Sequence, residues 1–223
     1  MKKILLLFCV LTFTLLHAQR DLYGYQSGTL IDTRSSNEFA GVDGSPYLKG
    51  DEFTKGKILT DEKVYENVDL RYNVYKDFIE IKVSESEIYK GSTKSNFSYE
   101  VHGEKLYLMN YIDNEVKKTG YLSCIACSKD DMLLNKYTKT YYPPEEANTG
   151  YQKSKPAKFS NNEEYYIKLK SNLYAIPLEN NTKKILSQFN NKQLDKFVKE
   201  NKLNLKKEDD LITFFKYYIN LNQ

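Results

Sequence analysis

An alternation of apolar and polar residues that begins near Lys57 constrains the fold of this chain more than any other feature. Its apolar face is formed by Val64, Val68, Leu70, Tyr72 and Val74, and its other face by Tyr65, Asn67, Asp69, Arg71 and Asn73. A period of two is that of a half-buried β-strand. Lys76 and Asp77 have the composition of a turn, and residues 79–83 alternate again. The sequence therefore predicts a β-hairpin here.

Runs of the same kind follow at residues 97–101, 105–112, 116–125, 165–169 and 174–178. The segments between them are short and turn-like, as at 102–104 and 113–115. Because a parallel crossover needs about a dozen residues or more, these connections favour antiparallel pairing. We expect an antiparallel β body over residues 56–178, a meander for which barrel-like and sandwich arrangements both fit.

The period changes to that of a helix after Leu178. Asn181 and Asn191 are suitable N-caps, and Glu208 begins an acidic first turn that opposes the positive end of a helix dipole. The large apolar residues of this segment are Leu186, Phe189, Leu194, Phe197, Leu211, Phe214 and Phe215. Left exposed, they would form a larger patch than soluble monomers tolerate. We expect residues 179–223 to be a helical segment packed on the β body, with a partner-binding tail as the alternative, so the fold class is α+β.

The first nineteen residues have the three-part layout of a cleaved secretory signal. Lys2 and Lys3 precede an apolar run over residues 4–16, and Ala18 supplies a small residue before the cut. The run is shorter than the roughly 20 residues that span a bilayer. We expect a signal peptide at residues 1–19 and an exported mature chain, periplasmic or secreted, without a transmembrane segment.

The charge of the mature chain is close to zero. Loss of Lys2 and Lys3 leaves 31 basic residues against 30 acidic ones. This balance indicates no nucleic-acid partner and no attraction to an anionic membrane.

Two segments have no sustained period. Residues 20–55 hold five of the ten glycines and predict an extended, flexible N-terminal arm. Residues 142–156 hold three of the five prolines. We interpret them as an ordered excursion over the sheet, or alternatively as a functional loop.

Short motifs throughout the chain resemble an uncharacterised family of exported proteins from bacteroidete-type Gram-negative bacteria. They are Gly44-Ser45-Pro46-Tyr47-Leu48, Phe53, Gly56, Tyr65, Leu70-Arg71-Tyr72-Asn73, Lys155-Pro156-Ala157-Lys158-Phe159, Tyr165-Tyr166-Ile167-Lys168 and Asn201-Lys202-Leu203. The likeness covers most of residues 44–219. It implies export and a β-rich body, and it carries no assigned reaction and therefore no catalytic residue.

Cys124 and Cys127 form the one pattern with reactive groups. An oxidising compartment favours a disulfide between them. Positions three apart on a regular strand point to opposite faces, so the bond requires a turn. A redox C-x-x-C pair, which normally opens a helix, is an alternative that a short helix over 129–136 would permit. Copper(I) on the two thiolates and a pair of unbonded buried thiols are the others.

Other chemistry is poorly supported by the sequence. The mature chain has one histidine, His102, which is too few for a zinc site together with two thiols. A serine hydrolase would have to use His102 alone. A glycosidase needs only two carboxylates, but the acidic pairs at 145–146 and 163–164 are merely adjacent. We assign no catalytic residue, no metal ligand and no cofactor.

The sequence favours a non-catalytic exported envelope protein that binds another protein or a cell-surface polymer. The first alternative is a hydrolase that acts on glycan or peptide through carboxylates the sequence does not identify. The second is a redox or copper-binding module at Cys124 and Cys127.

Overall fold

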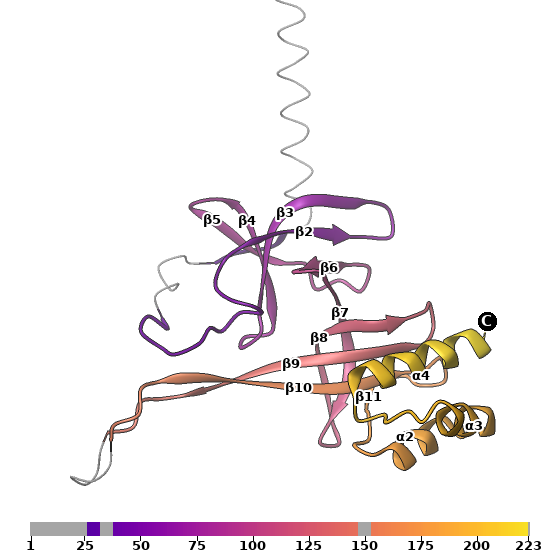
Figure 1. Cartoon of the computed structure of the whole chain (residues 1–223). Coiled ribbons are helices and arrows are strands. Elements are labelled where there is room, and N and C mark those ends of the chain that lie inside the picture. The colour runs from indigo at the N-terminus through magenta and orange to yellow at the C-terminus, as the bar shows by residue number, and fades with distance from the viewer. Residues whose placement is uncertain (1–25, 32–37, 147–152, 223) are drawn as a thin grey trace, which may run out of the picture.

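The computed structural model describes residues 26–31, 38–146 and 153–222 (Figure 1). The expected signal peptide at 1–19 lies outside the described residues. No helix in the part of the chain that is described is long and apolar enough to cross a membrane.

One antiparallel sheet of eleven strands forms the body of the described chain. The strands are β1 (Gln26–Leu30), β2 (Thr54–Leu59), β3 (Val64–Asn73), β4 (Phe78–Ser84), β5 (Glu87–Gly91), β6 (Ser98–Val101), β7 (Glu104–Asp113), β8 (Val116–Cys127), β9 (Met132–Tyr142), β10 (Lys158–Lys168) and β11 (Ile176–Pro177). Their order is β1-β5-β4-β3-β2-β6-β7-β8-β9-β10-β11. The sheet precedes three helices, so the predicted α+β class is confirmed.

The last five strands close into a ring. Residue 175, next to β11, bridges to Tyr111 of β7 in parallel, with Ala175 N–H donating to Asn110 O at 3.0 Å and Ile112 N–H to Ala175 O at 2.9 Å. β11 also pairs with β10. Inside this ring of strands, the aromatic side chains of Tyr111 and Tyr166 meet edge-on, with centroids 5.4 Å apart. They pack with the buried Leu122, Leu134 and Ala175.

A second core belongs to the first half of the sheet. Leu70, Tyr72, Ile79, Ile81 and Tyr99 form its centre and are all fully buried. The apolar face predicted from the alternation is therefore buried from Val68 onward, whereas Val64 is 49% exposed.

A buried polar network joins the two halves. Asp77, in the turn between β3 and β4, accepts hydrogen bonds from the Tyr72 hydroxyl at 2.6 Å and from Tyr121 N–H at 3.2 Å. Lys136 Nζ of β9 lies 2.8 Å from Asp77 Oδ2. Gly120 leaves room for this carboxylate, because an added Cβ would lie 2.2 Å from Asp77 Oδ2 and would displace it.

Three helices, α2 (Thr182–Phe189), α3 (Lys192–Glu200) and α4 (Glu208–Leu221), cover the outer face of the ring (Figure 1). The side chains of Asn181 and Asn191 cap α2 and α3, as predicted. Six of the seven large apolar residues expected to pack on the body belong to this helical core; Leu133 and Ile167 of the sheet complete it. The exception is Phe197, which stacks on Tyr217 at 3.8 Å instead.

Two segments between the predicted strands differ from what the sequence suggested. The short helix over 129–136, considered only as a setting for a redox pair, is not formed, because residues 132–136 belong to β9 and pair with β10. The described parts of the proline-rich segment, residues 142–146 and 153–156, do not cross the sheet as expected. They extend β9 and β10 into a projecting hairpin (Figure 1), held by paired backbone bonds between Glu145 and Lys155. Long polar strands can leave the body because their backbone groups bond to each other.

Candidate functional site

The segment over residues 38–51, expected to be part of an extended arm, packs on the polar face of β3 and β4. Backbone bonds fasten it at three places: Leu48 N–H to Tyr72 O, Val74 N–H to Pro46 O, and Phe159 N–H to Asp43 O, at 2.9, 2.9 and 2.8 Å. The segment therefore connects the first half of the sheet to the base of the projecting hairpin.

Arg71 is the centre of this contact. Its Nε lies 2.6 Å from Glu80 Oε2, and its Nη1 donates to Asp51 O at 2.7 Å. The guanidinium carbon lies 3.9 Å from the ring centroid of Tyr47 and 4.3 Å from that of Phe53. A planar guanidinium suits this combination of an ion pair and stacked rings. Arg71 thus holds residues from two distant parts of the chain together.

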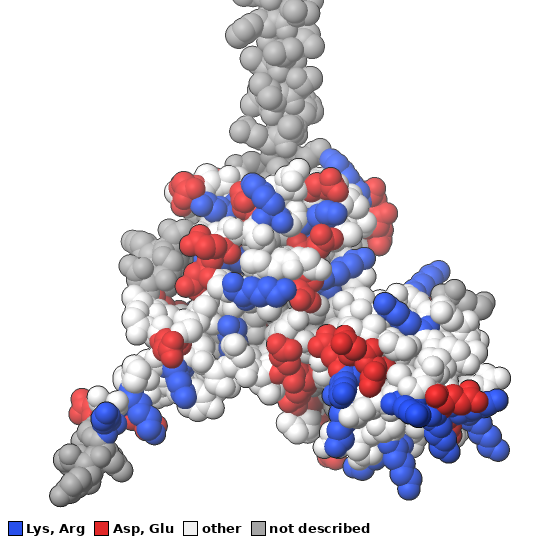
Figure 2. Space-filling model, viewed as in Figure 1, with Lys and Arg blue, Asp and Glu red and all other residues white. Residues whose placement is uncertain are grey.

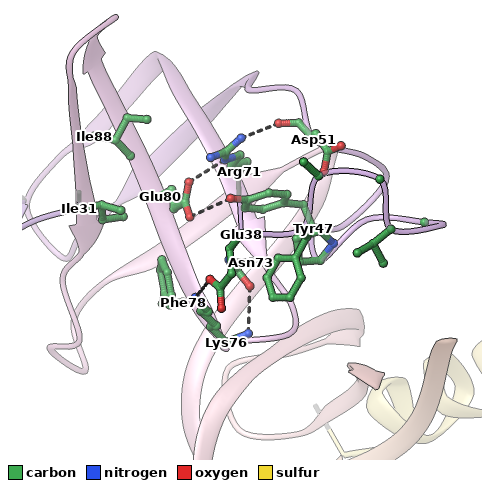
Figure 3. Close-up of a pocket in the computed structure, with 16 residues that line it drawn as sticks. Ile31, Glu38, Tyr47, Asp51, Arg71, Asn73, Lys76, Phe78, Glu80 and Ile88 are labelled. Carbon is green, nitrogen blue, oxygen red and sulfur yellow. Dashed lines mark hydrogen bonds and ion pairs between the residues drawn. The ribbon is translucent and has the colours of Figure 1, made fainter. Parts of the chain in front are cut away.

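The segment encloses a cavity of about 350 Å³ against the sheet, within the size range of small-ligand pockets. Figure 3 shows its walls: Tyr47 and Asp51 on the segment, Arg71 and Glu80 on the paired strands, and Phe78 at the start of β4. Ile31 and Ile88 provide apolar surface at one side.

Every described carboxylate in the cavity wall has a partner. Glu80, 2% exposed, is paired with Arg71 and accepts a hydrogen bond from the Tyr47 hydroxyl at 3.3 Å. Glu38 is 2.5 Å from Lys76 Nζ. Asp51 accepts a hydrogen bond from Ser45 at 2.5 Å.

The Tyr47 hydroxyl is also fixed in its protonated form. Burial, followed by the negative charge of Glu80, raises the pKa of Tyr47 to about 12. The cavity therefore presents a fixed, nearly charge-balanced set of donors and acceptors.

Four aromatic rings adjoin the cavity. Phe39 lines it and packs against Tyr75, Tyr141 and Phe159, with centroids 5.6, 5.5 and 4.9 Å away. Tyr75 is 39% exposed. We call these four residues the aromatic cluster. It presents a partly exposed apolar surface beside the polar cavity.

Cys124 and Cys127 lie in β8 with their Sγ atoms 2.05 Å apart and their Cα atoms 6.1 Å apart. The expected turn is absent. Instead, the register of β8 against β9 shifts between Cys124 and Ala126, which marks a β-bulge. One extra residue brings positions three apart onto the same side of a strand. The setting is a strand rather than a helix start, so the pair lacks the dipole that activates a redox thiol.

A second polar group lies between the two cores. Glu104, beside the turn that contains His102, accepts hydrogen bonds from Ser123 at 2.6 Å and Lys49 at 3.1 Å. Asn135 donates to Glu163 at 3.3 Å, while its own Oδ1, like His102 Nε2, has no hydrogen-bond partner among the described residues. No hydrogen bond joins His102 to Ser123 in the described chain.

The acidic pairs considered from the sequence, 145–146 and 163–164, take part in different contacts of the fold. Glu145 is paired with Lys155 on the projecting hairpin. Glu163, in the exposed part of β10, accepts a hydrogen bond from the buried Asn135 of β9. Within the described residues, no group of three or more His, Cys, Asp or Glu side chains could hold a metal ion.

The cavity has no signal in the sequence pattern. Alternation places Arg71 and Asn73 on the polar face of a strand, and Tyr47 and Phe53 belong to short motifs, but no pattern relates the two sets of residues. Residues 38–51 have no periodicity, so their docking on the sheet has no local signal.

Comparison of the chain with protein-family models, with curated proteins and with solved structures found no match.

Proposed function

We propose that this is an exported, non-catalytic binding protein whose cavity holds one sugar unit of a cell-surface polymer. The observation that carries the proposal is the combination of partnered carboxylates in the cavity wall with the aromatic cluster at its edge. Sugars present apolar C–H faces that pack on aromatic rings, and hydroxyls that pair with fixed carboxylates and amides.

The same geometry favours binding over hydrolysis. Acid–base cleavage of a glycoside needs one carboxylic acid and one free carboxylate on opposite sides of the bond. Glu38 and Glu80 are neutralised by Lys76 and Arg71. A carboxylate held in such a pair is not free to take one side of a scissile bond.

The test is a titration of the mature chain with defined neutral and N-acetylated oligosaccharides of two to six units, followed by calorimetry. Phe39→Ala should weaken binding at least tenfold, because it removes the ring shared by the cavity and the aromatic cluster. Tyr142→Ala is the matched control: Tyr142 is 47% exposed but lies outside the cavity wall and the cluster.

Thermal unfolding of both variants checks that the fold is kept. Equal loss of binding in both variants, or no binding of any oligosaccharide by the folded protein, would overturn the sugar assignment. Release of shorter oligosaccharides during the titration would show hydrolysis and replace the binding proposal.

A further inference from the structure

The near-neutral total charge conceals a strong segregation of charge. Residues 180–207, which include α2 and α3, contain eight lysines and two acidic residues, a net charge of +6. The mature chain carries +1, so the remainder carries −5. We call the eight lysines the basic face; they are Lys183, Lys184, Lys192, Lys196, Lys199, Lys202, Lys206 and Lys207.

The basic face is displayed to solvent. All eight lysines are exposed, and Figure 2 shows blue side chains gathered along the outer side of the helical lobe. On α3, Lys192, Lys196 and Lys199 follow one stripe, opposite the buried Leu194 and Val198.

Most of this charge is not neutralised by neighbouring acids. In the described chain, only Lys184 and Lys196 of the basic face lie within ion-pair distance of a carboxylate, of Glu179 and Glu200 at 3.4 and 3.7 Å. The other six make no ion pair in the described chain, although Glu208, Asp209 and Asp210 directly follow Lys207 in sequence. Unpaired like charges on one face repel each other, and a dense anionic surface would relieve that repulsion.

We infer that the basic face binds the anionic phospholipid surface of a bilayer. The cations are all lysines, and compact ammonium groups on flexible stems suit diffuse attraction to many lipid phosphates. Arginine forks, which recognise individual phosphates in two-point geometry, are absent from this segment. The face lies on a protruding lobe (Figure 2), which suits a flat, dense surface better than a single enclosed strand.

This contact differs from the proposed sugar site in both place and chemistry. The cavity lies in the first half of the sheet, whereas the basic face lies on the helices that cover the ring. The protein would rest on a bilayer through its helices and leave the cavity free for a polymer.

The test is co-sedimentation of the mature chain with vesicles of phosphatidylglycerol and phosphatidylcholine in equal amounts, and with phosphatidylcholine alone. We expect binding only to the first, and its loss at high salt, because screening shortens the range of these charges. The triple variant K192Q/K196Q/K199Q should weaken binding at least tenfold. The control K94Q/K117Q/K153Q removes the same charge from exposed sites outside the basic face and should change binding less than twofold.

Equal weakening by both triple variants would overturn the assignment to the basic face. Failure to bind the anionic vesicles at low salt would overturn the lipid contact itself. Binding to soluble polyphosphate without binding to vesicles would assign the face to a soluble polyanion instead. Phe39→Ala should bind vesicles like the parent protein, which separates this proposal from the sugar site.

Discussion

Lys136 and Asp77 are 59 positions apart in sequence, yet Lys136 Nζ and Asp77 Oδ2 lie 2.8 Å apart at the junction of the two halves of the sheet. Lys136 also donates to Tyr121 O at 3.1 Å and is 4% exposed. Burial lowers its pKa, an effect that the charge of Asp77 opposes. The pair therefore connects the β3–β4 turn to the ring of strands.

Removing the carboxylate of Asp77 should lower the free energy of unfolding more than removing the ammonium group of Lys136. Asp77→Asn leaves a buried ammonium without a counter-charge and should destabilise the protein by about 3–5 kcal/mol. Lys136→Met leaves a carboxylate that still reaches solvent, with 29% of the side chain exposed, and should cost about 1–3 kcal/mol. Urea unfolding measures both.

Lys118→Met is the matched control, since its pair with Asp113 is on the surface; it should leave the free energy of unfolding almost unchanged. Similar losses for all three variants would contradict a structural role for the buried pair.

Glu104 should make stability depend on pH. Burial alone would raise its pKa, but hydrogen bonds from Ser123 and Lys49 outweigh burial and hold the pKa below its usual 4.5. A carboxyl group with a lowered pKa in the folded state stabilises the fold above its unfolded pKa, and loses that contribution as the pH falls through the folded value.

Glu104→Gln should therefore be less stable than the parent at about pH 7, with a smaller difference at about pH 3. Urea unfolding at the two pH values measures this. Glu115→Gln, in an exposed turn, should show little difference at either pH. If Glu104→Gln lowered the free energy of unfolding equally at both pH values, folding would not favour the ionised form of Glu104.

The helical core should depend on Phe214 far more than on Phe197. Phe214 is fully buried against the sheet, so Phe214→Ala should cost about 3–5 kcal/mol. Phe197 is not part of that core and stacks on Tyr217 at its edge, so Phe197→Ala should cost about 1 kcal/mol. Thermal unfolding compares them. Equal effects would show that the helices do not share a core with the sheet.

Cys124 and Cys127 should be bonded to each other in protein recovered from an oxidising compartment. Signal cleavage would remove Cys9, which leaves these two thiols to pair across the bulge of β8. Thiol titration of the denatured, unreduced protein should find no free sulfhydryl. Two titratable thiols would contradict the disulfide and mean that the bulge in β8 is maintained without it.

Local patterns in the sequence predict most of the elements. Alternation gives the strands around residues 68–74 and 104–125, because a half-buried strand must place apolar side chains on one face. The caps at Asn181 and Asn191 and the acidic start of α4 are equally local, since they depend on backbone groups within one turn. The strand β9 is missed because Met132–Tyr142 alternates only in its outer part, where the hairpin leaves the body.

Tertiary structure alone decided how distant elements close on each other. The ring of strands forms because residue 175 pairs with β7. The Asp77 carboxylate packs against β8 because residue 120 is glycine. The cavity exists because the aperiodic segment 38–51 docks around Arg71. Likewise, a sum over the sequence gives only the net charge, whereas the folded helices gather eight lysines on one face. Such contacts form between residues that lie far apart in the sequence. Local propensity and short patterns therefore cannot predict them.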